Sequence, residues 1–106
     1  MTRTLPVRQS PPHASVIGLG AAEIARRIAA KELSARQTVD ALIARIEEVN
    51  PQLNAVVAPL FEQARRDALA ADERQARGET LPPLHGAPMT VKECYEVAGT
   101  PATMGL

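Results

Sequence analysis

Apolar positions along the chain recur at intervals of three and four residues in three separate stretches. That spacing places them on one face of an α-helix, so the pattern predicts amphipathic helices over about 21–32, 34–50 and 59–78. The middle stretch is the most regular, with apolar side chains at Val39, Leu42, Ile43, Ile46 and Val49. The last has a shallower stripe, made of Phe61, Ala64, Ala68 and Ala71.

Residues that favour helix ends stand at the borders of these stretches. Gly20 is an acceptable start for the first helix. Ser34 stands three residues before Gln37, the spacing in which a serine hydroxyl and a glutamine side chain satisfy each other's free backbone amides. The second helix is expected to end at Asn50-Pro51, and Gly78 can close the third. Between them, the short apolar segment 54–58 is expected to be buried and extended.

Beyond residue 78, prolines and glycines punctuate the chain, and one piece, 89–93, reads as a strand. Alternation places Met89 and Val91 on one face and Thr90 and Lys92 on the other. Lys92 would emerge near the strand's C-terminal end, where ligands gather in open α/β sheets. One strand cannot form a sheet alone, so we expect its partners to come from another copy or from protein missing here.

Composition narrows the class of protein. The 106 residues lie at the lower edge of one domain, and only 2% of them are aromatic. A core of Ala, Leu, Ile and Val would therefore be thin, which indicates an incomplete unit. The formal net charge is zero, which argues against nucleic acid or an anionic membrane surface as partner. No apolar run approaches the ~20 residues that span a bilayer.

The proline-bearing residues 1–18 are predicted to be a flexible leader, and 19–106 an incomplete domain. The single cysteine, Cys94, excludes an intramolecular disulfide, and with two histidines the chain offers no recognisable metal cluster. We therefore expect a cytoplasmic protein without a cofactor.

Lys92 is the residue that the pattern singles out for chemistry. A lysine at a strand end is more often a solvated surface charge, and on pattern alone that interpretation is favoured. To act as a base, its amine must be desolvated or placed near other cations, which lowers its pKa towards neutrality. A Cys94 thiol paired with His85 is the weaker option, because a lone cysteine is more often a buried hydrophobe and His85 suits a loop residue satisfied by backbone. The chain has three serines, of which two lie in the leader and one caps a helix, at Ser10, Ser15 and Ser34.

Two motifs in the last quarter of the chain occur in the order seen in a known family: Leu84-His85-Gly86-Ala87-Pro88-Met89-Thr90-Val91-Lys92-Glu93, then Val97-Ala98-Gly99-Thr100-Pro101-Ala102-Thr103 with Gly105. From about Leu19 to the end, the chain resembles the N-terminal part of the amidase signature family. The resemblance implies an α/β fold, a large mixed sheet wrapped by helices, although this part alone would be mostly helical. It also implies a Ser-cisSer-Lys triad that hydrolyses carboxamide C–N bonds, with Lys92 as its catalytic lysine. Both serines lie downstream in the family, so this chain alone is expected to be inactive.

Three interpretations stay open from the sequence. The chain can be a truncated amidase that acts on a small-molecule amide, a fragment of the amidase component of an amidotransferase, or a small helical interaction module derived from the same family. The residues around Lys92 do not distinguish the first two. The specific amide and the oligomeric state are equally open.

Overall fold

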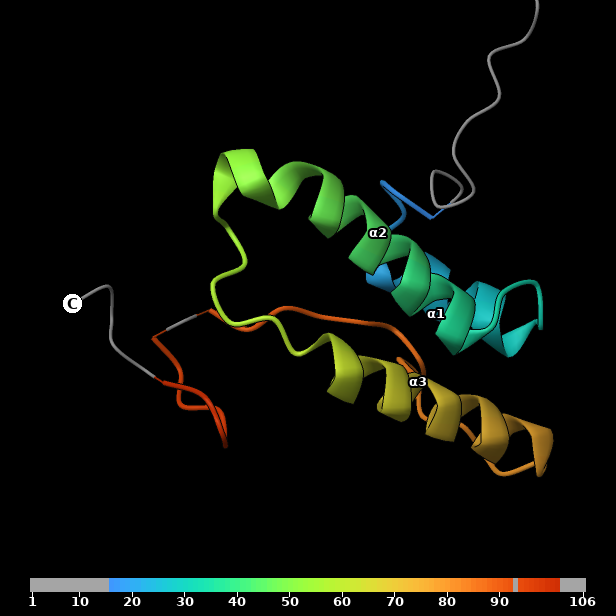
Figure 1. The fold of residues 1–106 in the computed structure, drawn as a ribbon. Coiled ribbons are helices and arrows are strands. Elements are labelled where there is room, and N and C mark those ends of the chain that lie inside the picture. The colour runs from blue at the N-terminus through green and yellow to red at the C-terminus, as the bar shows by residue number, and fades with distance from the viewer. Residues whose placement is uncertain (1–15, 93, 102–106) are drawn as a thin grey trace, which may run out of the picture.

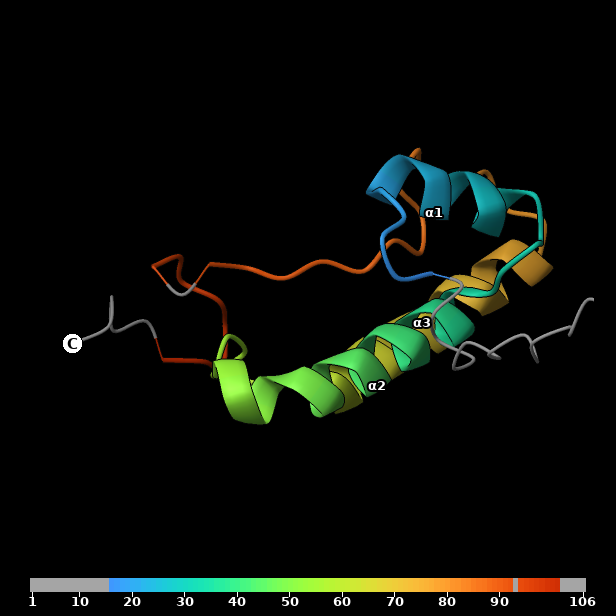
Figure 2. The same ribbon diagram turned by 90° about the horizontal axis from the view of Figure 1, so that it is seen from above.

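The computed structural model describes residues 16–92 and 94–101, which contain three helices: α1 (Ala21–Ala29), α2 (Ala35–Leu53) and α3 (Phe61–Ala76). Helices α2 and α3 run in opposite directions as a hairpin, and α1 lies on one face of this pair (Figures 1 and 2). The prediction of three helices is confirmed. Residues 1–15 of the predicted leader lie outside the described residues, and residues 16–18 form a turn closed by a hydrogen bond from Leu19 N to Val16 O at 3.2 Å.

A small aliphatic cluster joins the three helices. Its buried members come from all three helices and are Ile24, Ile28, Ala35, Val39, Ile43 and Ala68. Phe61, one of the chain's two aromatic residues, only packs against this cluster from a partly buried position. Most of the hydrophobic stabilisation therefore comes from a few aliphatic side chains, of which each isoleucine or valine contributes roughly 1.5–3 kcal/mol on full burial and each alanine less. The core is thin, as the composition predicts.

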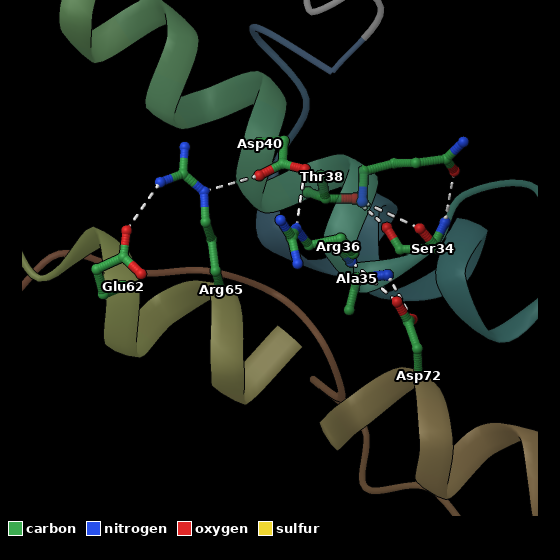
Figure 3. A network of polar contacts seen from close by, with 9 residues as sticks. Ser34, Ala35, Arg36, Thr38, Asp40, Glu62, Arg65 and Asp72 are labelled. Atoms are coloured by element: carbon green, nitrogen blue, oxygen red, sulfur yellow. Dashed lines mark hydrogen bonds and ion pairs between the residues drawn. The ribbon is translucent and has the colours of Figure 1, made fainter. Parts of the chain in front are cut away.

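Side chains from two helices satisfy the first backbone amides of α2. Ser34 Oγ accepts a hydrogen bond from Gln37 N, and the Gln37 side chain accepts one from Ser34 N, both at 3.0 Å, so the predicted capping box is confirmed. The Asp72 carboxylate, which projects from α3, accepts from Ala35 N at 2.7 Å and Arg36 N at 3.1 Å (Figure 3). A negative charge at a helix N-terminus also complements the helix dipole. Asp72 therefore fastens α3 to the start of α2.

Replacing Asp72 by asparagine should lower the free energy of unfolding by about 1–2 kcal/mol, because the charge and one of two acceptors are lost. The urea midpoint of the purified chain measures this. Asp67→Asn is the matched control on the same helix, because Asp67 only accepts an exposed bond from Gln63, a contact contributing a few tenths of a kcal/mol. Equal midpoints for the two variants would contradict the capping role.

A second polar link between α2 and α3 runs through Asp40. Its carboxylate accepts from Arg36 Nε, one turn earlier on α2, at 2.9 Å and from Arg65 Nε on α3 at 3.1 Å (Figure 3). Burial acts to raise the pKa of Asp40, but the hydrogen bonds from Arg65 and Arg36 outweigh burial and lower it. The stability that Asp40 contributes is therefore present above its ordinary pKa of about 4 and is lost as the pH falls through the lower folded-state value.

Helices α1 and α3 end in the same hydrogen-bonding motif. At the end of α3, Gly78 N bonds to Gln75 O and Glu79 N to Arg74 O, with Gly78 at φ +76°, so this predicted stop is confirmed. At the end of α1, the position equivalent to Gly78 is Lys31, at φ +63°. This left-handed turn ends α1 at Ala29, short of the predicted residue 32. A side chain with a Cβ is strained in this conformation, which glycine adopts freely.

Lys31→Gly should therefore stabilise the chain by about 0.5–1 kcal/mol, once the greater freedom of glycine in the unfolded state is set against the relieved strain. A thermal melt followed by circular dichroism measures the gain. Lys31→Ala is the control, because alanine removes the charge and retains the strained Cβ. A gain of the same size in both variants would show that the charge, and not the backbone, is the source.

Two predictions about extended segments are wrong. Residues 54–58 are exposed, apart from a half-buried Val56, because α2 continues through Pro51 to Leu53 and closes with Asn54 at φ +48°. The Asn50 side chain then holds the returning backbone, bonding to both Val56 N and Val56 O. The predicted strand at 89–93 is also not formed: residues 89–92 belong to no strand, and Glu93 lies outside the described residues. A strand needs a hydrogen-bonded neighbour, and no described segment supplies one.

Candidate functional site

The chain reverses after α3 and passes beside the helices as far as a turn at residues 83–86 (Figure 1). His85 is buried in this turn, and its Nε2 lies 2.9 Å from the carbonyl oxygen of Ala71 on α3. Because a carbonyl only accepts, Nε2 carries the proton. The turn also has hydrogen bonds from His85 N to Pro82 O and from Ala87 N to Leu84 O, at 3.0 and 3.1 Å. The prediction that backbone satisfies His85 is confirmed.

Gly86 brings the same turn against α1 and α2. Its φ is +80°, and a Cβ added there would lie 3.0 Å from Ile28 Cδ1 and 3.1 Å from Ala35 Cβ. The backbone therefore approaches the helices so closely that a Cβ at this position would fit only if Ile28 or Ala35 shifted by a few tenths of an ångström. Ala87 follows and packs against the core cluster. Sequence reasoning missed this contact, whose one local signal is a glycine directly after the buried histidine.

Beyond Ala87, residues 88–92 and 94–101 lead away from the helices, and we call them the arm (Figures 1 and 2). Apolar side chains of the arm stand in solvent: Met89 is 82% exposed, Val91 48% and Tyr95 65%. The alternation of the sequence assigns Met89 and Val91 to one face of a strand. Because both side chains are uncovered, the arm has the apolar pattern of a sheet strand without the sheet.

Lys92 lies in the arm, exposed, and among the described residues its Nζ has no hydrogen-bond or ion-pair partner. Its carbonyl accepts from Tyr95 N at 3.0 Å, in the turn that follows. A shallow hollow farther along the arm is lined by Glu96, Val97, Ala98 and Thr100 and does not include Lys92. The described residues thus present the lysine to solvent and build no pocket around it.

The other candidate groups are not assembled. No hydrogen bond between the described residues joins Cys94 to His85, whose Nε2 proton points to Ala71. The Ser34 hydroxyl is committed to the α2 cap, and Ser10 and Ser15 lie outside the described residues. The part of the chain that the structure covers holds no group of three or more His, Cys, Asp or Glu that could bind a metal ion. None of its helices is long and apolar enough to cross a membrane.

Known proteins resemble most of this chain. The amidase family matches residues 37–106, a range that holds both motifs and Lys92. An acylamidase of Rhodococcus erythropolis is 42% identical over 88 residues, which cover 83% of this chain and 18% of that protein. A glutamyl-tRNA(Gln) amidotransferase component from Streptomyces coelicolor is 43% identical over 90 residues, covering 85% of this chain and 18% of that protein. An indoleacetamide hydrolase of Bradyrhizobium diazoefficiens is 40% identical over 95 residues, covering 90% of this chain and again 18% of that protein.

No solved structure matches the chain at a significant level. The chain spans about a fifth of the length of the curated relatives it matches. The match of residues 37–106 covers well over half of the sequence and includes the turn at 83–86 and the arm. The chain therefore belongs to the amidase signature family.

Proposed function

We propose that this chain is one part of an amidase that hydrolyses carboxamide C–N bonds, and that Lys92 is the catalytic lysine it contributes. One observation carries the proposal: the region that matches the family ends in an arm that presents Lys92 with no partner among the described residues. A base in this position needs a nucleophile from elsewhere. The chain's own serines offer none, because Ser34 is a helix cap and the other two belong to the predicted leader.

In the proposed reaction, the neutral Lys92 amine accepts a proton through a bridging serine from a nucleophilic serine. Both serines come from protein outside this sequence. The nucleophile attacks the amide carbonyl, and the tetrahedral intermediate collapses to an acyl-enzyme as the C–N bond breaks and the amine leaves with a proton. Water then releases the carboxylic acid.

The names of the relatives indicate two candidate classes of substrate. Two of the named relatives are an acylamidase and an indoleacetamide hydrolase, so we propose a small or aryl carboxamide. Another is a component of an amidotransferase, and membership in such a component is the second candidate. An assay with both a simple amide and glutamine separates the two.

A chimera tests the proposal. In it, the stretch of the Rhodococcus acylamidase that matches this chain is replaced by the chain itself. Because 42% identity preserves the pattern of this region, we expect the chimera to release amine from an acylamide, while the acylamidase with that stretch deleted releases none. A folded chimera that is inactive on every amide, glutamine included, would contradict the proposal.

A further inference from the structure

The turn at residues 83–86 is where the chain is fastened to all three helices before it reaches Lys92. His85 donates to Ala71 on α3, and Gly86 lies against Ile28 of α1 and Ala35 of α2. After this turn, Met89 to Lys92 are exposed. Among the described residues, the direction in which the arm leaves the helices is therefore set at the turn.

A small rotation of the backbone at this turn produces a large displacement of Lys92. Lys92 lies six residues beyond Gly86, a span of about 20 Å in extended chain. Over that length, a rotation of about 3° at the turn moves Lys92 by roughly 1 Å, and a displacement of this size can lower a catalytic rate by about 10²-fold. A catalytic base on such an arm therefore requires that the backbone at the turn be held in one orientation, even where the arm later pairs with a sheet.

The hydrogen bond from His85 to Ala71 is suited to hold the turn at residues 83–86 in one orientation. His85 is 8% exposed, and a buried, directional bond holds the turn at one angle, which apolar packing alone does not specify. The acceptor lies on α3, the helix that Asp72 and Arg65 fasten to α2. The His85 bond thus connects the start of the arm to two helices that are themselves joined by polar contacts. We propose that His85 is a positioning residue for Lys92, an inference that rests on the function proposed above.

The chimera allows a kinetic test. His85→Leu keeps the volume roughly and removes the donor, so we expect kcat to fall about 10- to 100-fold, in line with a displacement of about 1 Å or less at Lys92, while KM changes little. His85→Gln retains a side-chain N–H near the position of Nε2 and should recover kcat to within a few fold. A native kcat in His85→Leu, or no recovery in His85→Gln, would overturn the inference.

A second measurement needs no activity. A nitroxide attached to Cys94, the single cysteine, broadens the backbone amide NMR signals of nearby residues in the 106-residue chain. We expect His85→Leu to change which amides of α1 to α3 are broadened, while the helical signals themselves are retained. Should that variant unfold the helices, His85→Asn, which is polar but too short to reach Ala71 O, takes its place. An unchanged broadening pattern would overturn the inference.

These results separate the two proposals. If Lys92→Ala leaves the chimera fully active, the proposed function fails and the positioning role falls with it. If Lys92→Ala is inactive and His85→Leu behaves as native in either experiment, only the positioning role fails.

Discussion

Lys92→Ala should lower kcat of the acylamidase chimera by about a hundredfold to ten-thousandfold, the range expected when a general base is removed. The reason is chemical: the variant lacks the amine that accepts the serine proton through the bridging hydroxyl in the proposed reaction. KM should change little, because the proposed role concerns proton transfer and not substrate binding. Initial rates of amine release over a range of acylamide concentrations separate the two parameters.

Two further variants make the Lys92 result specific. Lys92→Arg keeps the positive charge but cannot lose its proton at neutral pH, so it should be as inactive as the alanine variant. Lys31→Ala removes the only other lysine, which lies in the turn after α1 and outside the arm, and should leave kcat unchanged. Substantial activity in Lys92→Arg would show that a positive charge, and not a base, is what the site requires.

Gly86→Ala should lower the free energy of unfolding of the chain by about 2–3 kcal/mol. About 1 kcal/mol comes from placing a Cβ at φ +80°, and the rest from the overlap with Ile28 and Ala35, which are fully buried and leave little room to move. Urea denaturation followed by circular dichroism measures the loss.

Gly78→Ala is the matched control for this prediction. Gly78 has a similar φ of +76°, but a Cβ there would meet no atom within 4 Å. It should therefore show the backbone strain alone, about 1 kcal/mol. Equal decreases in the free energy of unfolding for the two variants would mean that the close approach at Gly86 adds no stability. The His85 hydrogen bond would then be the contact that holds the turn against the helices.

The helices and the start of α2 could be predicted from the sequence because their causes are local. Apolar spacing and the Ser34 capping box both act within a few residues. The errors lie where a neighbour overrides a local preference. The Asn50 side chain bonds the returning backbone at Val56, and α2 passes Pro51. Lys31 adopts a left-handed backbone conformation, which a lysine in the sequence does not indicate as a glycine would.

The contacts that hold the candidate site could not be predicted, because they join distant parts of the chain. Asp72 caps a helix 37 residues earlier in the sequence, and nothing in its own surroundings marks it as a cap. Gly86 meets α1 and α2 only once all three helices have packed. The strand at 89–93 is predicted from alternation, which describes how a segment would sit in a sheet and cannot show that a sheet is present.

The most direct test of the central claim is ammonia release from a simple carboxamide, measured side by side for the purified 106-residue chain and for its acylamidase chimera. The claim is that this chain contributes a catalytic lysine and no nucleophile. It predicts release by the chimera, abolished in Lys92→Ala, and none by the chain alone. Ammonia release by the isolated chain that disappears in Lys92→Ala would contradict it, because the chain would then hold a complete catalytic site.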